Sequence, residues 1–405
     1  MAHYNACLSG LPKHSYARGG WRRRMATKNP RFGFIGAGTF LNHASVSPPC
    51  RAARRVVHEA ADGIAREDDR YVRSRATSTA ARAAFAAFVG SRVDRVMCFQ
   101  NTSAALSAVG WGLRWRRGDE VLVSRNEFVS NYLAWDLQSR RGVRLRSLPA
   151  VDEWVDPERL KKTIRKSTRV VAVSAVHWAT GARQDLRALA GIAHDVGALL
   201  VVDAAQSLGA APHSPTADRY DVLATNTYKW LLSYNGTAFA DFSKAALDSI
   251  DPASVGWLSV AGEPEPEVVR GGRPTYRLGR GVEQLLGGAP SALSNLSATA
   301  ALHDIDAYGQ TRIRRELLRV TEGVREVANR LHLPVVTPDE PRRHAGIVAL
   351  RVRDAEVTAK KLRRRGIRLG ARGGFLRVSP HFYTRPEDVD SLESALRRVR
   401  ARPSE

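Results

Sequence analysis

Between residues 93 and 242, short apolar runs alternate regularly with longer amphipathic stretches, and this pattern constrains the fold more than any other feature. The apolar runs predict β-strands at residues 96–99, 120–124, 143–147, 170–174, 198–202, 222–225 and 237–240. Helices are predicted between them at 103–115, 129–140, 157–165 and 185–196. Such alternation requires crossover connections, so it predicts an α/β fold with a mostly parallel sheet covered on both faces.

The 405-residue chain exceeds the usual size of a single-core domain, so we expect two domains. Residues 29–290 are predicted to form the large domain. Residues 291–405 are predicted to form a linking helix and a smaller α+β domain, with strands at 346–352 and 375–379 and helices at 354–365 and 386–400. Residues 1–28 show no hydrophobic period, which predicts a disordered basic tail.

The net charge of +23 is compatible with nucleic-acid binding, because phosphates attract such charge. The arginines are scattered along the chain rather than gathered in one stripe, so nucleic acid is not favoured as a partner. The three cysteines have no metal-binding spacing, which predicts no metal site and a reducing, cytoplasmic location. No apolar run reaches transmembrane length, so no membrane association is expected.

Ligands of parallel sheets bind at the carboxyl ends of the strands, and Asp203 ends one of the predicted strands. Lys229 follows it by 26 residues, and lysine supplies only nine of the 63 basic residues. A desolvated lysine can form an imine, whereas arginine stays protonated and does not. A buried aspartate needs a cationic partner, such as a protonated pyridine nitrogen. Together the two residues predict a site for pyridoxal phosphate.

Three further motifs each allow two interpretations. The Asn101-Thr102-Ser103 segment could simply cap a helix, or could bind a phosphate at the helix N-terminus. Arg377 could be a solvated strand residue, or could bind the carboxylate of an amino acid. Phe128 could lie over a cofactor ring or pack in the core. By contrast, the Gly36-Ala37-Gly38 segment lacks the third glycine and the helix that a dinucleotide site needs.

These motifs occur in an order that resembles the class V aminotransferase family of fold-type I pyridoxal phosphate enzymes. That family includes cysteine desulfurases, isopenicillin N epimerase-like proteins and kynureninases. The resemblance covers nearly all of residues 30–400, and it rests on the Asn101-Thr-Ser103, Glu127-Phe128, Thr180-Gly181, Asp203-Ala-Ala-Gln206, Tyr228-Lys229-Trp230 and Arg377-Val-Ser-Pro-His-Phe-Tyr383 motifs.

The resemblance implies a role for each matching residue. Lys229 would carry the imine, Asp203 would pair with the pyridine nitrogen and Gln206 would contact the phenolic oxygen. Phe128 would stack on the ring. Residues expected to hold the phosphate are Thr102, Ser103, Asn226 and Tyr228. Residues expected to border the substrate are Arg377, His43, Ala44 and Trp178. The resemblance also implies a homodimer, because the family builds each site from two subunits.

Two departures from the family pattern bear on function. Cysteine desulfurases carry a nucleophilic cysteine shortly before the substrate-binding arginine, whereas this chain has no cysteine after Cys98. We therefore expect that it is not a cysteine desulfurase. Ala289 stands where a threonine usually reaches the phosphate of the neighbouring subunit. Either Ser291 replaces that threonine, or the phosphate has one contact fewer.

The expected activity is a class V aminotransferase or epimerase-like transformation of an amino acid through a Schiff base on Lys229. β-Elimination of the C–S lyase type is the alternative reaction. A non-catalytic protein of the same fold that binds nucleic acid is the alternative from another class.

Overall fold

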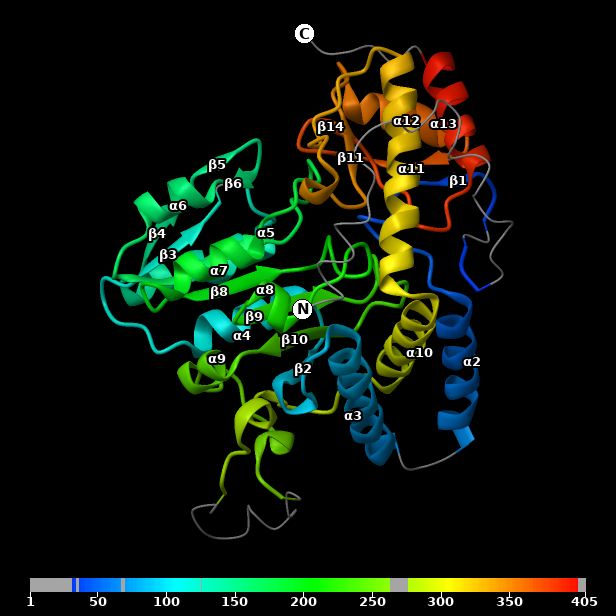
Figure 1. The fold of residues 1–405 in the computed structure, drawn as a ribbon. Helices are drawn as coiled ribbons and strands as arrows, with labels where there is room; N and C mark the ends of the chain where they lie inside the picture. Colours follow the sequence, from blue (N-terminus) through cyan, green and yellow to red (C-terminus); the bar gives the residue numbers. More distant parts are fainter. Residues whose placement is uncertain (1–30, 34–35, 67–69, 125, 263–275, 400–405) are drawn as a thin grey trace.

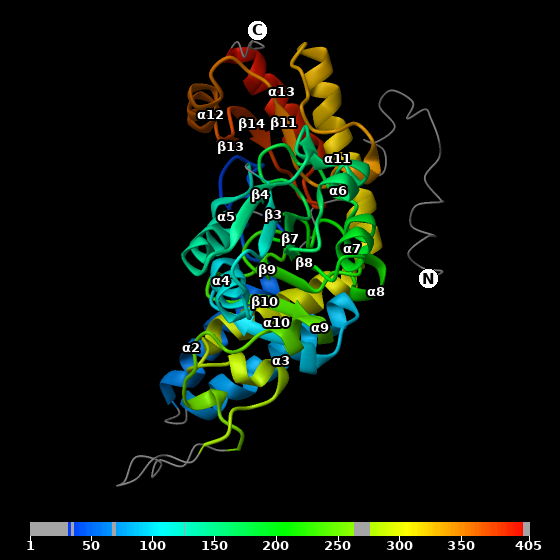
Figure 2. The same ribbon diagram turned by 90° about the vertical axis from the view of Figure 1, so that its left-hand side faces the viewer.

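The computed structural model describes residues 31–33, 36–66, 70–124, 126–262 and 276–399. The predicted tail at 1–28 lies outside the described residues. Figures 1 and 2 show a central sheet with a smaller C-terminal unit at one end and, at the other, the helices α2 (Arg51–Arg66), α3 (Arg70–Val89) and α10 (Ala292–Tyr308). No helix in the described part of the chain combines the length and the apolar character needed to span a membrane.

The central sheet has seven strands in the order β2-β10-β9-β8-β7-β3-β4. Only β10 runs antiparallel to its neighbours; every other pairing is parallel. The predicted α/β fold with a mostly parallel sheet is therefore confirmed. The strands are β2 (Val96–Phe99), β3 (Glu120–Val123), β4 (Arg144–Ser147), β7 (Thr168–Ser174), β8 (Leu199–Asp203), β9 (Val222–Asn226) and β10 (Ala238–Phe242).

Alternate residues of the inner strands belong to two different hydrophobic clusters, one on each face of the sheet. In β8, Leu200 and Val202 join the cluster that includes Leu189 of α7, whereas Val201 joins the cluster that includes Trp135 of α5. Both faces are thus covered, which explains why these strands read as continuous apolar runs. The helices between the strands are α4 (Thr102–Gly112), α5 (Val129–Asp136), α6 (Pro157–Thr163), α7 (Leu186–His194), α8 (Pro215–Asp218) and α9 (Lys244–Ser249).

The C-terminal unit contains an antiparallel sheet in the order β11-β14-β13. Its elements are α11 (Gln310–Arg330), β11 (Val348–Leu350), α12 (Ala355–Arg364), β12 (Ile367–Arg368), β13 (Gly370–Arg372), β14 (Phe375–Val378) and α13 (Pro386–Arg398). The helical region expected after residue 290 is divided at Gly309 (φ 97°) into α10 (Ala292–Tyr308) and α11. The sequence pattern does not indicate β13.

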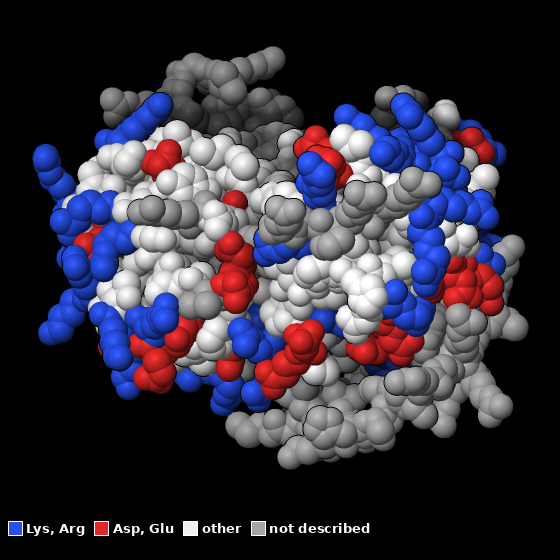
Figure 3. All heavy atoms as spheres, turned by 90° about the horizontal axis from the view of Figure 1, so that it is seen from above, with Lys and Arg blue, Asp and Glu red and all other residues white. Residues whose placement is uncertain are grey.

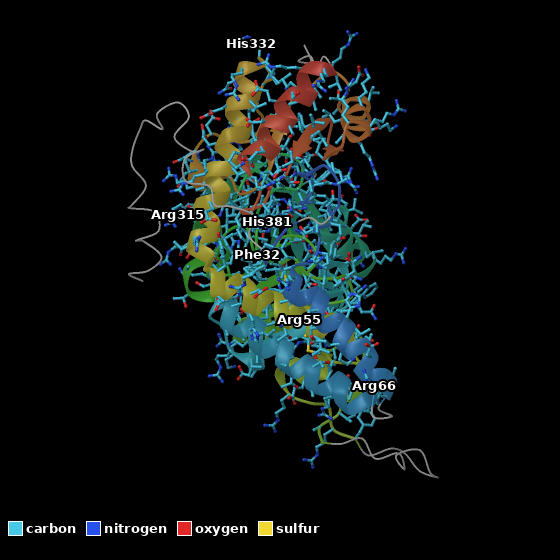
Figure 4. All side chains as sticks on the ribbon, turned by 90° about the vertical axis from the view of Figure 1, so that its right-hand side faces the viewer. Phe32, Arg55, Arg66, Arg315, His332 and His381 are labelled. Carbon is cyan, nitrogen blue, oxygen red and sulfur yellow. The ribbon has the colours of Figure 1, made fainter. Side chains whose placement is uncertain are left out.

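The N-terminal segment connects the two ends of the molecule. Strand β1 (Thr39–Phe40) pairs in parallel with β12, and α2 (Arg51–Arg66) and α3 (Arg70–Val89) then pack against α10. Phe32, which precedes β1, contacts Phe382 beside His381 near the middle of the molecule (Figure 4). His332 lies at the far end of α11. The proposed boundary between residues 290 and 291 stays a prediction.

Close backbone contact explains the second glycine of the Gly36-Ala37-Gly38 segment. Gly38 has a φ of 88°, and a Cβ there would lie 2.2 Å from the carbonyl oxygen of Gly366. Glycine is therefore required for the approach of β1 to the turn that precedes β12.

Candidate active site

The predicted site residues gather at the carboxyl edge of the central sheet. Glu127 follows β3, Ser174 ends β7, Asp203 ends β8 and Asn226 ends β9. Ser174 is directly opposite Asp203 in the strand register. Lys229 follows β9 by three residues, and α4 begins nearby at Thr102. The edge therefore brings an amine, two carboxyl groups and a helix N-terminus together.

Lys229 is nearly buried between two aromatic rings. Its side chain is 7% exposed, and Nζ lies 5.4 Å from the ring centroid of Phe128 and 5.8 Å from that of Tyr228. The pKa of this amine is lowered to about 8, mainly by burial; Asp203 opposes the shift, and the charges of Arg377 and Arg372 add to it. A substantial fraction of the amine is therefore neutral, and hence nucleophilic, near pH 8.

We expect the apoprotein to incorporate pyridoxal phosphate at a rate that rises with pH and levels off near pH 8. Only the neutral amine attacks a carbonyl, so the plateau follows the pKa of Lys229. The second-order rate constant can be followed by absorbance between about pH 6 and about pH 10. A free lysine derivative with a pKa of about 10.4 provides the control for titration of the cofactor itself. A protein rate that still rises in parallel with this control above pH 9 would contradict the assignment.

The two carboxyl groups at this edge have different surroundings. Asp203 is 4% exposed and accepts a hydrogen bond from the backbone N–H of Ala205 at 2.8 Å. Burial raises its pKa, against the opposing charge of Lys229. No described arginine, lysine or histidine lies within ion-pair distance of Asp203, so a cationic ligand would complete its environment.

Glu127 connects two strand ends, a role that the sequence did not indicate. Its oxygens accept hydrogen bonds from the backbone N–H (2.7 Å) and the hydroxyl (2.6 Å) of Ser174, and burial raises its pKa to about 7. It also accepts one from the N–H of Phe128 at 3.1 Å. Glu127 therefore positions Phe128 beside Lys229. A carboxylate four residues after the end of the buried strand β3 is the sequence feature that could have indicated this role.

Gln206 and the loop at residues 43–44 form a connected hydrogen-bond network. Gln206 donates from Nε2 to the carbonyl oxygen of Ala44 at 2.9 Å and accepts from Nε1 of Trp230 at 3.0 Å. The two ring nitrogens of His43 lie 2.8 Å from the carbonyl oxygen of Ser379 and 2.8 Å from the Tyr383 hydroxyl. His43 is fully buried and both of its ring nitrogens are hydrogen-bonded, so its ring positions the loop. Contact of Gln206, His43 and Ala44 with cofactor or substrate stays a prediction.

The start of α4 contains polar atoms that a phosphate could engage. Asn101 caps the helix by accepting from the N–H of Ala104 at 2.8 Å, and Ser103 shares a 2.7 Å hydrogen bond with Ser130. The buried Thr102 hydroxyl and the buried Oδ1 of Asn226 have no hydrogen-bond partner among the described residues. Unpaired buried polar atoms are costly, so a polar ligand at this helix N-terminus would stabilise them.

Arg377 is a buried cation whose described partners are all neutral. It is 2% exposed, and it donates to the carbonyl oxygen of Trp178 and to the hydroxyl of Ser45, both at 2.7 Å. Its Nε has no described partner, and burial lowers its pKa to about 9, with the charge of Arg372 adding to the shift. An anionic ligand would offset the cost of burying this charge.

The rings of Trp178 and Phe128 form an aromatic wall between Arg377 and the start of α5. The indole N–H of Trp178 donates to the carbonyl oxygen of Asn126 at 2.8 Å. The ring centroids of Trp178 and Phe128 are 6.0 Å apart in an edge-to-face arrangement. Phe128 is 40% exposed, so much of its ring remains free for further contact.

Ala289 and Ser291 line a groove of about 780 Å³ that also contacts Ala104 of α4. The hydroxyl of Ser291 already donates to the Ser294 hydroxyl at 3.0 Å and accepts from the Ser294 N–H at 3.3 Å. Ser291 therefore caps α10, and a contact to phosphate would compete with that cap.

Basic side chains are spread over the face shown in Figure 3 and are interspersed with acidic ones, rather than forming a single stripe. On this face, the charges therefore do not form the continuous basic surface that nucleic-acid binding usually requires.

Comparison with known proteins identifies relatives over most of the chain. The family model described as "Aminotransferase class-V" matches residues 56–392. A probable cysteine desulfurase of Methanothermobacter thermautotrophicus is 29% identical, with 79% of this chain and 82% of the relative covered. An isopenicillin N epimerase of Streptomyces clavuligerus is 28% identical, with 78% and 83% covered. The apo structure of a cysteine desulfurase from Thermococcus onnurineus superposes with a TM-score of 0.81 at 23% identity, covering 89% of this chain and 94% of that chain.

Proposed function

The chain belongs to the class V aminotransferase family of pyridoxal phosphate enzymes, and from this premise we propose that it transforms an amino acid at Cα by transamination or epimerisation. The observation that carries the proposal is the pairing of the nearly buried Lys229 amine with the buried guanidinium of Arg377, which has no acidic partner among the described residues. An imine-forming amine and a carboxylate-binding cation are what an amino acid substrate requires at one site.

The residues present suit pyridoxal phosphate. Asp203 offers a buried carboxylate for the pyridine nitrogen, and Lys229 offers an amine with a pKa near 8. Thr102 and Asn226 offer unpaired polar atoms beside the N-terminus of α4. We propose that these four residues hold the cofactor, with Ser103 and Tyr228 beside the phosphate, Gln206 beside the phenolic oxygen and Phe128 against the ring. When bound, the cofactor supplies an electron sink for negative charge at Cα.

Arg377 binds the α-carboxylate of the substrate and so fixes which Cα bond faces the reactive side of the site. Trp178 holds Nη1 of Arg377 through its carbonyl oxygen, and its ring and that of Phe128 keep water away from the reacting atoms. The amine of Lys229 would remove the Cα proton and could return it. Its pKa of about 8 suits a general base that works near neutral pH.

We also propose that the protein does not form a persulfide as a cysteine desulfurase does. Persulfide chemistry needs a thiolate, but burial raises the pKa of both Cys50 and Cys98 to about 11. Residues 370–376, directly before Arg377, contain no cysteine. Cys7 lies outside the described residues.

An exposed apolar stripe on α5 supports a homodimer. Val129 and Leu133 are spaced four residues apart on α5 and are 62% and 47% exposed, and Leu137, directly after the helix, is 37% exposed. Side chains with this spacing lie on one face of a helix. Trp111 of α4 is also exposed. Such apolar side chains are typical of protein–protein interfaces, and a second copy of the chain is the partner we propose.

The reaction type can be tested by incubating the cofactor-loaded protein with individual amino acids, with and without a keto acid. We expect deuterium exchange at Cα, accompanied by keto-acid-dependent amino transfer or by loss of optical purity. Pyruvate and ammonia released without a keto acid would instead establish β-elimination. Alanine and sulfane sulfur from cysteine would overturn the exclusion of desulfurase chemistry. Absence of Cα exchange with every amino acid would contradict the proposed function.

A further inference from the structure

We propose that the substrate is a dicarboxylic amino acid whose side-chain carboxylate is bound by Arg372. This inference rests on the proposed function, because it assumes that Arg377 binds the α-carboxylate. It adds the chemical class of the substrate, which neither the family nor its varied members define.

The β13–β14 hairpin places Arg372 and Arg377 on the same face of its sheet. Gly370 lies opposite Arg377 in the register, and Arg372 lies opposite Phe375. Residues directly opposite each other share a face, and so do residues two apart along one strand. Arg372, two residues after Gly370, therefore projects from the same face as Arg377.

The turn of the hairpin keeps this arrangement in register. Gly373 and Gly374, which join the strands, have φ values of 57° and 80°. A two-residue loop in which both residues have positive φ forms a tight turn whose twist matches that of the flanking strands. A Cβ on Gly373 would lie 3.0 Å from the Cβ of Ala179, so the turn packs against the residue that follows Trp178. The hairpin thus borders the aromatic wall of the site.

The charge of Arg372 acts on the site and has no acidic partner there. It contributes to lowering the pKa of both Lys229 and Arg377. Its Nη1 donates to the carbonyl oxygen of Ala371 at 2.8 Å, and no described aspartate or glutamate lies within ion-pair distance. Two guanidinium groups that repel each other at one site are stabilised together when each binds a carboxylate.

The two arginines differ in burial, which distinguishes their roles. Arg377 is 2% exposed and is held by Trp178 and Ser45, so it provides one fixed anchor. Arg372 is exposed and lies opposite Phe375 in the strand register, so it can follow a side chain that extends toward the rim. A dicarboxylic amino acid matches this arrangement, because its α-carboxylate would bind Arg377 and its side-chain carboxylate would bind Arg372.

Equilibrium binding of two isosteric pairs tests the inference: glutamate against glutamine, and aspartate against asparagine. Dissociation constants are measured by calorimetry and by the change in cofactor absorbance of the loaded protein. We expect the wild type to bind at least one acid about tenfold more tightly than its amide, with the preference weakening as salt is raised. In Arg372→Gln the preference should fall to about twofold or less, while amide binding stays unchanged.

Arg364→Gln provides the matched control, because it removes the same charge from an exposed site in the last turn of α12. It should retain the preference of the wild type. Equal binding of acids and amides by the wild type, or an acid preference that survives Arg372→Gln, would overturn the inference. If amides still bind and Lys229 carries a pyridoxyl group, the proposed function stands and only the assignment of Arg372 fails. If no amino acid binds and Lys229 carries no such group, the proposed function and the assignment of Arg372 both fail.

Discussion

Replacing Lys229 with alanine is expected to abolish covalent attachment of pyridoxal phosphate and to lower turnover by about a thousandfold or more. The variant loses the only amine found between the rings of Phe128 and Tyr228 in the described site. It also loses the proposed base at Cα, and general bases contribute about a hundredfold to ten-thousandfold to a rate. Borohydride reduction followed by peptide mapping should find the pyridoxyl group on Lys229 in the wild type and on no residue in the variant.

Lys244→Ala is the control for this experiment, because Lys244 is an exposed lysine paired with Asp248 on α9. It should retain both the adduct on Lys229 and full turnover. A pyridoxyl adduct on another lysine of the wild type, or normal turnover in Lys229→Ala, would remove the basis of the proposed function. A protein that instead carried no cofactor and bound DNA in a salt-dependent manner would favour the non-catalytic alternative.

The central sheet was predictable because its strands are buried on both faces. A strand such as β8 then appears as an unbroken apolar run, and its end at Asp203 marks the ligand-binding edge. Elements stabilised by distant contacts gave no such signal. Strand β1 has two residues and is stabilised by β12, more than 300 positions away. Strand β13 includes glycine and is held by its pairing with β14.

The residue types that form the candidate site were predictable from the sequence, but the contacts between those residues were less so. Lys229, Asp203 and Arg377 were recognisable because their residue types follow strand ends or interrupt apolar runs. The position of Glu127 against Ser174 depends on the alignment of β3 and β7, which no local pattern encodes. Likewise, Arg372 shares a face with Arg377 only because of the register of the β13–β14 hairpin, and a sequence reading without β13 cannot relate their side chains.

Replacing Arg377 with methionine is expected to weaken amino acid binding by about a hundredfold or more without lowering the melting temperature. Truncating one member of a buried, hydrogen-bonded charge pair costs about 2–5 kcal/mol of binding energy. The melting temperature is not expected to fall with the affinity, because the protein without substrate buries this cation beside neutral partners. Burial lowers its pKa to about 9, so the charged form carries a penalty in the folded state.

The sign of this penalty follows from the two pKa values. Both the folded and the unfolded chain carry the protonated arginine at pH 7, so the cost of burying the charge falls on the folded state. Methionine removes the charge at every pH. It leaves the carbonyl oxygen of Trp178 and the hydroxyl of Ser45 without their donors, at about 1–3 kcal/mol each where water is excluded. Both residues are only partly buried, so water recovers part of that loss.

Thermal unfolding of the apoprotein and titration of the loaded protein with one amino acid separate the two effects. Arg377→Met should melt at or above the wild-type temperature at pH 7, and its affinity should be lost for acids and amides alike. Arg377→Lys retains the charge but not the planar fork, so it should recover part of the affinity. A variant that melts well below the wild type, or that binds amino acids normally, would show that Arg377 serves the fold and not the substrate. The opposite result would identify a buried charge that the protein retains at a cost to its own stability, because a substrate carboxylate completes it.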